Sequence, residues 1–197
     1  MIHASETIEI TWDGPCSWPG HESENGLNPI PRIPGVYLQT FEYQQGYLIY
    51  AAGITQRRVP VRFREHTQNY LDGKYTVLDI AAAQQGVRQE IWHGWYYERE
   101  HRDEFEERKS ILVEAVHRQL AGFRIFVADL GERGKEKRIL ERLEAAIMLS
   151  LYEQPPPIRD IPDRGMHLAP RWDSERPIHI KSSCHSVLVG LPHCLQI

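Results

Sequence analysis

Two polar side chains stand one helical turn apart just after Pro60, and together they could bind an anion and move a proton. Arg62 and His66 are four residues apart, so on a helix they share one face, which Asn69 extends. The same segment carries an apolar stripe for packing, so a charged guanidinium and an imidazole would flank a buried face. The alternative is a solvated helix face, the usual setting for an isolated pair of this spacing.

A carboxylate occupies an apolar setting later in the chain. Glu144 belongs to a strongly helical stretch, and its neighbours at helical spacing include Leu140, Ile147 and Met148. Burying a carboxylate there is unfavourable unless the carboxylate is paired or binds a cation. A salt bridge to an arginine is one interpretation, and a metal-binding or catalytic role is the other. Glu141, on the charged side of the same stretch, is expected to be solvated.

A hairpin, a further strand and two helices are expected to position these groups. Residues 36–43 and 47–52 are apolar, tyrosine-containing runs separated by a short polar loop, which is the pattern of a β-hairpin. Residues 60–71 predict a helix with a proline in its first turn. Residues 123–130 form an apolar run typical of a buried strand. The pattern of residues 136–153 predicts the helix that carries Glu144.

The remaining segments are interpreted from their composition and periodicity. Residues 7–12 alternate as a strand does, and residues 13–34 are rich in Gly, Pro, Ser and Asn, which predicts a long ordered loop. Residues 74–99 show no clear pattern apart from a cluster of aromatic side chains. Residues 104–120 predict a helix, and residues 177–183 predict a strand in the tail.

This order of elements predicts an α+β fold. The expected sheet is small and mainly antiparallel, with three or slightly more strands flanked by helices. Residues 1–33 would be an N-terminal extension with one strand and a loop. Residues 34–154 would be the core, with an inserted region at about 75–120, and residues 155–197 would be a tail packed on the core.

The composition is that of an ordinary soluble chain. Of the 197 residues, 41% are hydrophobic and 25% are charged. No stretch approaches the ~18–20 apolar residues of a membrane span, and the first residues lack the basic and apolar regions of a signal peptide. Three scattered cysteines do not make a disulfide framework, so a cytoplasmic location is expected. The formal net charge is −4, yet four arginines cluster in one segment, Arg57, Arg58, Arg62 and Arg64.

Four short motifs follow one another along the expected core. Gly35-Val36-Tyr37 opens the first strand of the hairpin, and Ala51-Ala52-Gly53 closes the second. Arg62 and His66 follow on a helix, and Leu143-Glu144 lies on the last long helix. In this order the motifs resemble those of the GIY-YIG nuclease family, which has Gly-Ile-Tyr, Tyr-Ile-Gly, an arginine–histidine helix and a leucine–glutamate helix. Each motif alone is common, whereas the ordered combination is much more specific.

The sequence departs from the family pattern at two places within or just beyond residues 34–154. Ala51 stands at the position of the second-motif tyrosine. Tyr50 comes one residue earlier, so on a regular strand it would face the opposite side of the sheet unless a bulge rotates it. The family also tends to carry an asparagine beyond the glutamate helix, and the nearest counterpart here is Asp163.

The resemblance implies a metal-dependent DNA endonuclease that uses one Mg²⁺ or Mn²⁺ ion. Glu144 would hold the ion, which keeps most of its water ligands. Arg62 would contact the scissile phosphate, because its fixed fork of donors suits two phosphate oxygens. Tyr37 would bind or deprotonate the attacking water, and His66 would assist Tyr37 or the phosphate. Four further residues would support the site: Tyr50, Arg64, Asn69 and Asp163.

The implied partner is DNA, expected to be double-stranded, in a compact restriction-type or mobile-element nuclease. Basic residues near the site would bind it: Arg57, Arg58, Arg64 and Lys74. The alternative function is a non-catalytic nucleic-acid-binding module on the same scaffold, which the alanine at position 51 and the acidic balance of the chain motivate.

Sequence specificity would come from regions outside the motifs. The inserted region holds an aromatic cluster that is interpreted as local core or a dimer contact, with base stacking as the alternative: Trp92, Trp95, Tyr96 and Tyr97. A homodimer is therefore one expectation. The tail holds two cysteines and two histidines whose spacing matches no common zinc site: Cys184, His185, His193 and Cys194.

Overall fold

The tyrosine-rich hairpin forms the centre of the fold, as its pattern predicts. In this computed structural model, which describes residues 6–95 and 97–197, strands β3 (Gly35–Tyr43) and β4 (Gly46–Thr55) pair antiparallel. Gln44 turns the chain between them with a positive φ of 53°, a conformation typical of tight hairpins. β7 (Arg124–Ala128) pairs antiparallel with the other side of β3. The expected placement of these three strands in one sheet is confirmed.

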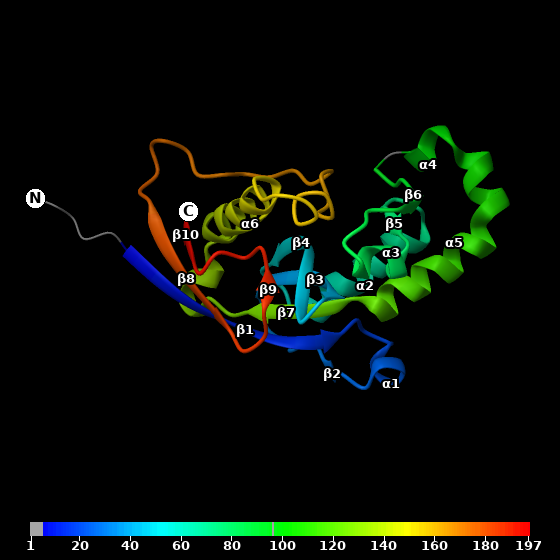
Figure 1. Ribbon diagram of the computed structural model, residues 1–197. Helices are drawn as coiled ribbons and strands as arrows, with labels where there is room; N and C mark the ends of the chain where they lie inside the picture. Colours follow the sequence, from blue (N-terminus) through cyan, green and yellow to red (C-terminus); the bar gives the residue numbers. More distant parts are fainter. Residues whose placement is uncertain (1–5, 96) are drawn as a thin grey trace, which may run out of the picture.

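The sheet as a whole is much larger than the sequence analysis predicts, so the expected small, mainly antiparallel sheet is wrong. Within the described residues, eight strands form one mixed sheet that curls into a half-barrel (Figure 1). Beyond β7 it continues through β1 (Glu6–Ser17), β8 (Ile178–Cys184) and β10 (Cys194–Gln196). β1 runs parallel to β8, and two short strands add further parallel pairs, β2 (Asn28–Pro29) on β1 and β9 (Leu188–Val189) on β4.

The error has a physical reason, because the extra strands come from the two ends of the chain. In the parallel pair, Glu6 of β1 stands opposite Ile178 of β8. Alternation within each run predicts a strand, but it does not predict which distant strand will be its neighbour. The strands expected at residues 7–12 and 177–183 are present, and each adds to the central sheet.

Helices cover both faces of the sheet (Figure 1). α6 (Lys137–Tyr152) packs its apolar side on one face, with Leu140, Leu143 and Ile147 in the same core as strand residues of β3 and β7. α2 (Val59–Leu71) and α5 (Arg102–Gly122) pack on the other face. The three predicted helices are thus confirmed with shifted ends. No helix in the described ranges is long and apolar enough to cross a membrane.

The inserted region adds short elements beside α5. A two-stranded sheet joins β5 (Val77–Leu78) to β6 (Glu90–Trp92), and α3 (Ile80–Gln84) lies between them in sequence. α4 (Tyr97–Glu100) leads into α5. These elements contact α5, so the inserted region is anchored to one side of the sheet through that helix.

Trp92 and Tyr97 pack within the inserted region, which agrees with their interpretation as local core. Trp92 is buried, and its indole N–H donates to the carbonyl oxygen of Gly73 at 2.7 Å. Its ring meets Tyr97 edge-on, with 5.0 Å between the ring centroids. Tyr96, from the same cluster, lies outside the described residues.

The segment predicted as a long loop, residues 13–34, contains more regular structure than expected. β1 continues to Ser17, and α1 (Glu22–Asn25) and β2 follow. Trp18 fixes this segment on the sheet, because its buried ring stacks on Phe123 and its indole N–H donates to Thr67 of α2 at 2.8 Å. A short 3₁₀ helix, η1 (Gly131–Lys135), connects β7 to α6.

Candidate active site

A cavity of about 310 Å³ opens along the edge of β4. Among the described strands, β9 is the only one on this side of β4, and it pairs only with Tyr47 and Leu48. The later part of β4, including Ala51 and Gly53, therefore lines the cavity as a free strand edge. Helices α2 and α6 cover opposite faces of the sheet, and side chains from both reach this edge.

Tyr37 and His66 are hydrogen-bonded in the wall of the cavity. Tyr37 lies on β3 opposite Gly53, is 2% exposed, and places its Oη 2.7 Å from Nε2 of His66 on α2. Burial raises the pKa of Tyr37, while the positive charge of Arg62 opposes the increase. Burial and the same charge lower the pKa of His66 to about 3. The imidazole is therefore neutral at ordinary pH.

The second ring nitrogen of His66 also has a partner. Nδ1 lies 3.3 Å from Oη of Tyr75, which in turn accepts a hydrogen bond from the side-chain amide of Asn69 at 3.0 Å. Tyr75 lines the cavity, whereas Asn69 is not part of the cavity lining. The predicted supporting residue Asn69 therefore reaches His66 through Tyr75.

Two glycines permit close approach of the backbone, as their motif positions predict. A Cβ on Gly53 would collide with the ring and hydroxyl of Tyr37, so the phenol lies directly over this glycine. Gly35 has a φ of 144°, and a Cβ there would collide with the carbonyl oxygen of Ala128 on β7. Glycine thus makes room for the tyrosine at one position and for the neighbouring strand at the other.

Arg62 lines the cavity with a partly exposed guanidinium. One of its nitrogens is 3.0 Å from Glu65, which also pairs with Arg57 at 2.8 Å. Hydrogen bonds from these two arginines lower the pKa of Glu65 to about 2. The charge of Arg62 opposes the increase that burial causes in the pKa of Tyr37 and Glu144, and it adds to the decrease in the pKa of His66.

Glu144 faces the cavity from α6 as an unpaired carboxylate. Burial raises its pKa to about 7; the charge of Arg62 opposes this increase and that of Glu141 adds to it. Among residues 6–95 and 97–197, no hydrogen-bonding or ion-pairing group lies in contact with the Glu144 carboxylate. Glu141, one turn away, is instead 2.9 Å from Lys137. The salt-bridge interpretation therefore fits Glu141 and not Glu144.

A β-bulge brings Tyr50 into the cavity despite its position one residue before Ala51. Gln39 of β3 pairs with Ala51, but the next residue, Thr40, pairs with Ile49, so Tyr50 is the extra residue of the bulge. Tyr50 and Ala51 consequently face the same side, and both line the cavity. The bulge thus places a phenol beside Ala51 in the cavity wall.

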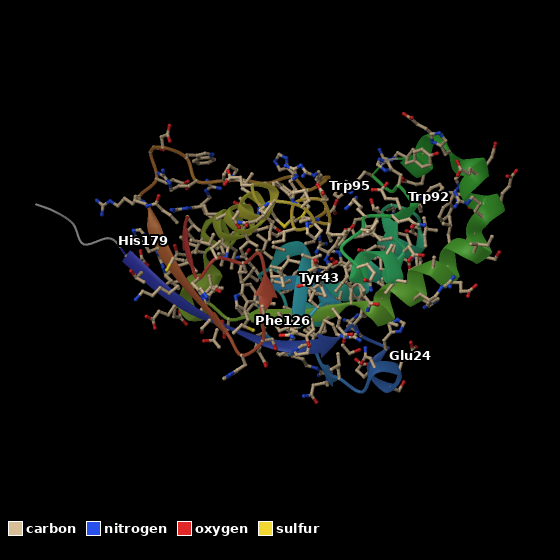
Figure 2. All side chains as sticks on the ribbon, in the orientation of Figure 1. Glu24, Tyr43, Trp92, Trp95, Phe126 and His179 are labelled. Carbon is tan, nitrogen blue, oxygen red and sulfur yellow. The ribbon has the colours of Figure 1, made fainter. Side chains whose placement is uncertain are left out.

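The inserted region and the tail meet at the cavity through Trp95 and Asp163. The indole N–H of Trp95, a residue labelled in Figure 2, donates to Oδ1 of Asp163 at 3.0 Å, and a Cβ on Gly165 would collide with the Trp95 ring. The backbone N–H of Asp163 donates to the carbonyl oxygen of Tyr50 at 2.8 Å. The tail therefore docks on the bulge, and one face of the Trp95 ring is occupied by protein.

The residues present fit a divalent ion that retains most of its water ligands. In the described part of the chain, no group of three His, Cys, Asp or Glu side chains is placed to hold a metal ion. The Glu144 carboxylate is nevertheless unpaired, mostly buried, and open to a cavity that can hold several waters and a phosphate group. A single carboxylate with water and phosphate ligands is an ordinary arrangement for Mg²⁺.

The basic residues expected to bind DNA lie outside the lining of this cavity. Arg57, Arg58 and Arg64 are exposed near the start of α2, and Lys74 follows the helix and pairs with Asp72 at 2.9 Å. Arg57 is paired with Glu65, whereas Arg64 has no ion-pair partner among the described residues. The positive charge available to a polyanion is therefore smaller than the number of arginines suggests.

Several cavity residues are absent from the sequence predictions. Tyr75 begins a segment without a clear pattern, and nothing local distinguishes it from the tyrosines that only pack. His167 and Met166 belong to the tail and line the cavity because the tail docks on β4. Their contribution depends on a long-range contact, so no spacing rule could have identified them.

Comparisons with known proteins supply no match. Neither the family models nor the curated proteins nor the solved structures contain one that is similar to this chain. The resemblance to GIY-YIG nucleases therefore rests on the sequence motifs, and these comparisons do not test it.

Proposed function

We propose that this protein is a divalent-metal-dependent endonuclease that hydrolyses phosphodiester bonds in DNA, with an active site like that of the GIY-YIG nucleases. The observation that supports it most is the convergence of Tyr37, Arg62, His66 and Glu144 on one cavity. They come from three elements, on both faces of the sheet. Independent packing roles do not explain why an unpaired carboxylate, an arginine and a tyrosine–histidine pair share one small space.

Each of the four side chains suits one part of phosphodiester hydrolysis. Glu144 would hold a Mg²⁺ or Mn²⁺ ion, which when bound would offset charge on the phosphate and make a water ligand more acidic. Arg62 would contact the scissile phosphate through its fork of donors. Tyr37 would bind the attacking water and, once its own phenolic proton has passed to solvent through the cavity, take the proton of that water, while His66 would hold the Tyr37 oxygen in place.

Tyr50 and Asp163 would support this site. The bulge gives Tyr50 a place in the cavity wall, so the alanine at position 51 does not leave the second motif without a phenol. Burial raises the pKa of Asp163, while hydrogen bonds from Gly165 and Trp95 oppose the increase. Double-stranded DNA remains the expected substrate, in keeping with a compact restriction-type or mobile-element nuclease.

A cleavage assay with a matched pair of variants tests the proposal. Purified protein is incubated with supercoiled plasmid DNA and with Mg²⁺, Mn²⁺ or EDTA. Cleavage is expected with either ion and not with EDTA. Glu144→Gln keeps the shape of the side chain and removes its charge, so cleavage should fall by about 10³-fold or more. Glu141→Gln, on the same helix, should cleave within about twofold of the wild type, because its ion pair with Lys137 is at the surface.

Three outcomes would contradict the proposal in different ways. Cleavage by Glu144→Gln at the wild-type rate would eliminate the proposed metal ligand. Full cleavage in EDTA would eliminate the dependence on a metal. DNA binding without cleavage under any of these conditions would favour the non-catalytic nucleic-acid-binding module instead.

A further inference from the structure

His66 is held at both ring nitrogens by groups from different parts of the chain. Nε2 lies 2.7 Å from Oη of Tyr37 on β3, and Nδ1 lies 3.3 Å from Oη of Tyr75, which follows α2. Asn69, on the same helix as His66, donates its side-chain N–H to the Tyr75 oxygen at 3.0 Å. A continuous chain of hydrogen bonds thus leads from Asn69 through Tyr75 and His66 to Tyr37 in the cavity.

A neutral imidazole can donate only one of its two hydrogen bonds. Burial and the charge of Arg62 keep His66 neutral, so its ring carries one proton, either on Nε2 facing Tyr37 or on Nδ1 facing Tyr75. The two tautomers have opposite effects on Tyr37. In the first the ring donates to the phenolic oxygen, and in the second the ring accepts the phenolic proton.

The hydrogen bond from Asn69 favours the first tautomer. The Tyr75 oxygen already accepts an N–H from Asn69, which leaves its own proton free to donate and makes it a better donor. Nδ1 of His66 is the acceptor within reach. With Nδ1 accepting, the ring proton is on Nε2 and is donated to Tyr37. The Tyr37 oxygen then has an imidazole N–H on one side and the guanidinium of Arg62 on another.

We propose that Tyr75, oriented by Asn69, is a positioning residue that holds His66 as the Nε2-protonated tautomer, so that His66 donates to the oxygen of Tyr37. Two donors on that oxygen stabilise its negatively charged form, which is the form able to accept a proton from water. The inference about the tautomer does not depend on nuclease activity, whereas its kinetic consequence rests on the proposed nuclease function.

Nitrogen-15 NMR of the imidazole rings tests the tautomer without any activity measurement. In histidine-labelled wild-type protein at pH 7, His66 should show the shifts of a ring protonated at Nε2 and bare at Nδ1. Tyr75→Phe removes the donor and should shift the ring toward the Nδ1-protonated tautomer or a mixture. Asn69→Ala should shift it in the same direction by less. Tyr47→Phe removes a phenolic hydroxyl elsewhere on the sheet, outside the lining of the cavity, and should leave the His66 resonances unchanged.

A kinetic measurement then connects the tautomer with catalysis. If the wild type cleaves DNA, Tyr75→Phe should lower kcat by about tenfold with little change in KM, the loss expected for one neutral hydrogen bond. The proposal is overturned if wild-type His66 is protonated at Nδ1, or if Tyr75→Phe leaves the ring shifts unchanged in a folded protein. A wild type that shows the expected tautomer but cleaves no DNA would contradict the proposed function and leave the positioning role intact.

Discussion

The two walls of the cavity differ in whether their polar side chains have partners within the protein. On the wall formed by β3 and α2, Tyr37, His66 and Arg62 all have polar partners within the protein. On the α6 wall, the Glu144 carboxylate has no partner among the described residues, and its pKa is raised to about 7 by burial. One wall is therefore preorganised by hydrogen bonds, while the other carries a carboxylate whose negative charge no group in the described part of the chain pairs with.

Under the proposed function, this difference would separate two tasks that one site must combine. Groups that orient a reacting oxygen must be held in fixed directions, which hydrogen bonds within the protein provide. A group that binds a cation must be free of competing cations in the protein, so it stands unpaired until the ion arrives. Glu141 and Glu144 show the same contrast on one helix, since Lys137 and Arg138 pair with Glu141 and, within the described residues, neither pairs with Glu144.

The largest effect within the preorganised wall is expected from Arg62→Lys. Lysine keeps the positive charge but lacks the planar fork of donors, so it cannot hold both Tyr37 and two phosphate oxygens. Cleavage should fall by about 10²–10³-fold, measured as kcat on plasmid DNA. Arg57→Lys is the matched control, because Arg57 shares the partner Glu65 but lies outside the cavity lining. Wild-type cleavage by Arg62→Lys would mean that Arg62 acts only through its charge, and equal losses in both variants would mean that the fork of donors at the cavity has no special role.

The unpaired wall can be tested through stability alone. The raised pKa of Glu144 means that the folded protein is penalised when the carboxylate is ionised. The penalty is absent below about pH 4.5, where the group is protonated in both states, and complete above about pH 7. Glu144→Gln should therefore increase the free energy of unfolding by up to about 3 kcal/mol at pH 8.5 in EDTA, and by almost nothing at pH 4.

Urea unfolding at the two pH values measures this difference, with Glu141→Gln as the control. Because Glu141 loses a surface ion pair, that variant should be destabilised by at most about 1 kcal/mol. Addition of Mn²⁺ should stabilise the wild type more than Glu144→Gln, since the ion binds only the folded site. A Glu144→Gln variant less stable than the wild type at pH 8.5 would show that the carboxylate has a stabilising partner.

The comparison of the walls also shows what the sequence can and cannot predict. Helical periodicity located α2 and α6 and placed Arg62, His66 and Glu144 on them, since each helix is specified by residues three and four apart. The ordered motifs then indicated that these side chains belong to one site with Tyr37, and all four line one cavity.

The features that depend on distant contacts were not predictable from local patterns. The pairing of β1 with β8 joins the two ends of the chain, which is why the expected sheet was too small. The bulge at Tyr50 depends on the register of β4 against β3, and no residue type in that stretch reveals it. Tyr75 and Trp95 act through contacts with His66 and Asp163, which the inserted region and the tail bring together only in the folded chain.

A smaller effect is expected from crowding the preorganised wall at Gly53. A methyl group there collides with the Tyr37 ring, so Gly53→Ala should displace the phenol from His66. Cleavage should fall by about ten- to a hundredfold, and the protein should lose about 1–3 kcal/mol of stability, as overpacked cores do. Gly134→Ala is the control, because the added methyl group would lie at an ordinary 3.6 Å from the Cβ of Leu130. Wild-type cleavage by Gly53→Ala would show that the position of Tyr37 is not critical.

The smallest effect concerns the charges outside both walls. Arg64 is exposed and unpaired among the described residues, whereas Arg57 is already neutralised by Glu65. If DNA follows the start of α2 into the cavity, Arg64→Gln should remove one phosphate contact and reduce the slope of log K against log[salt] by about 0.9. Arg57→Gln should change the slope by less, because its charge is shared with a carboxylate.

Fluorescence anisotropy with a labelled duplex in EDTA, over a range of NaCl concentrations, measures both slopes. Lys181→Gln, on β8 and outside the lining of the cavity, should leave the slope unchanged. Equal slopes for the wild type and Arg64→Gln would place the DNA on another face, and Glu144 would then have to reach its phosphate from a different direction.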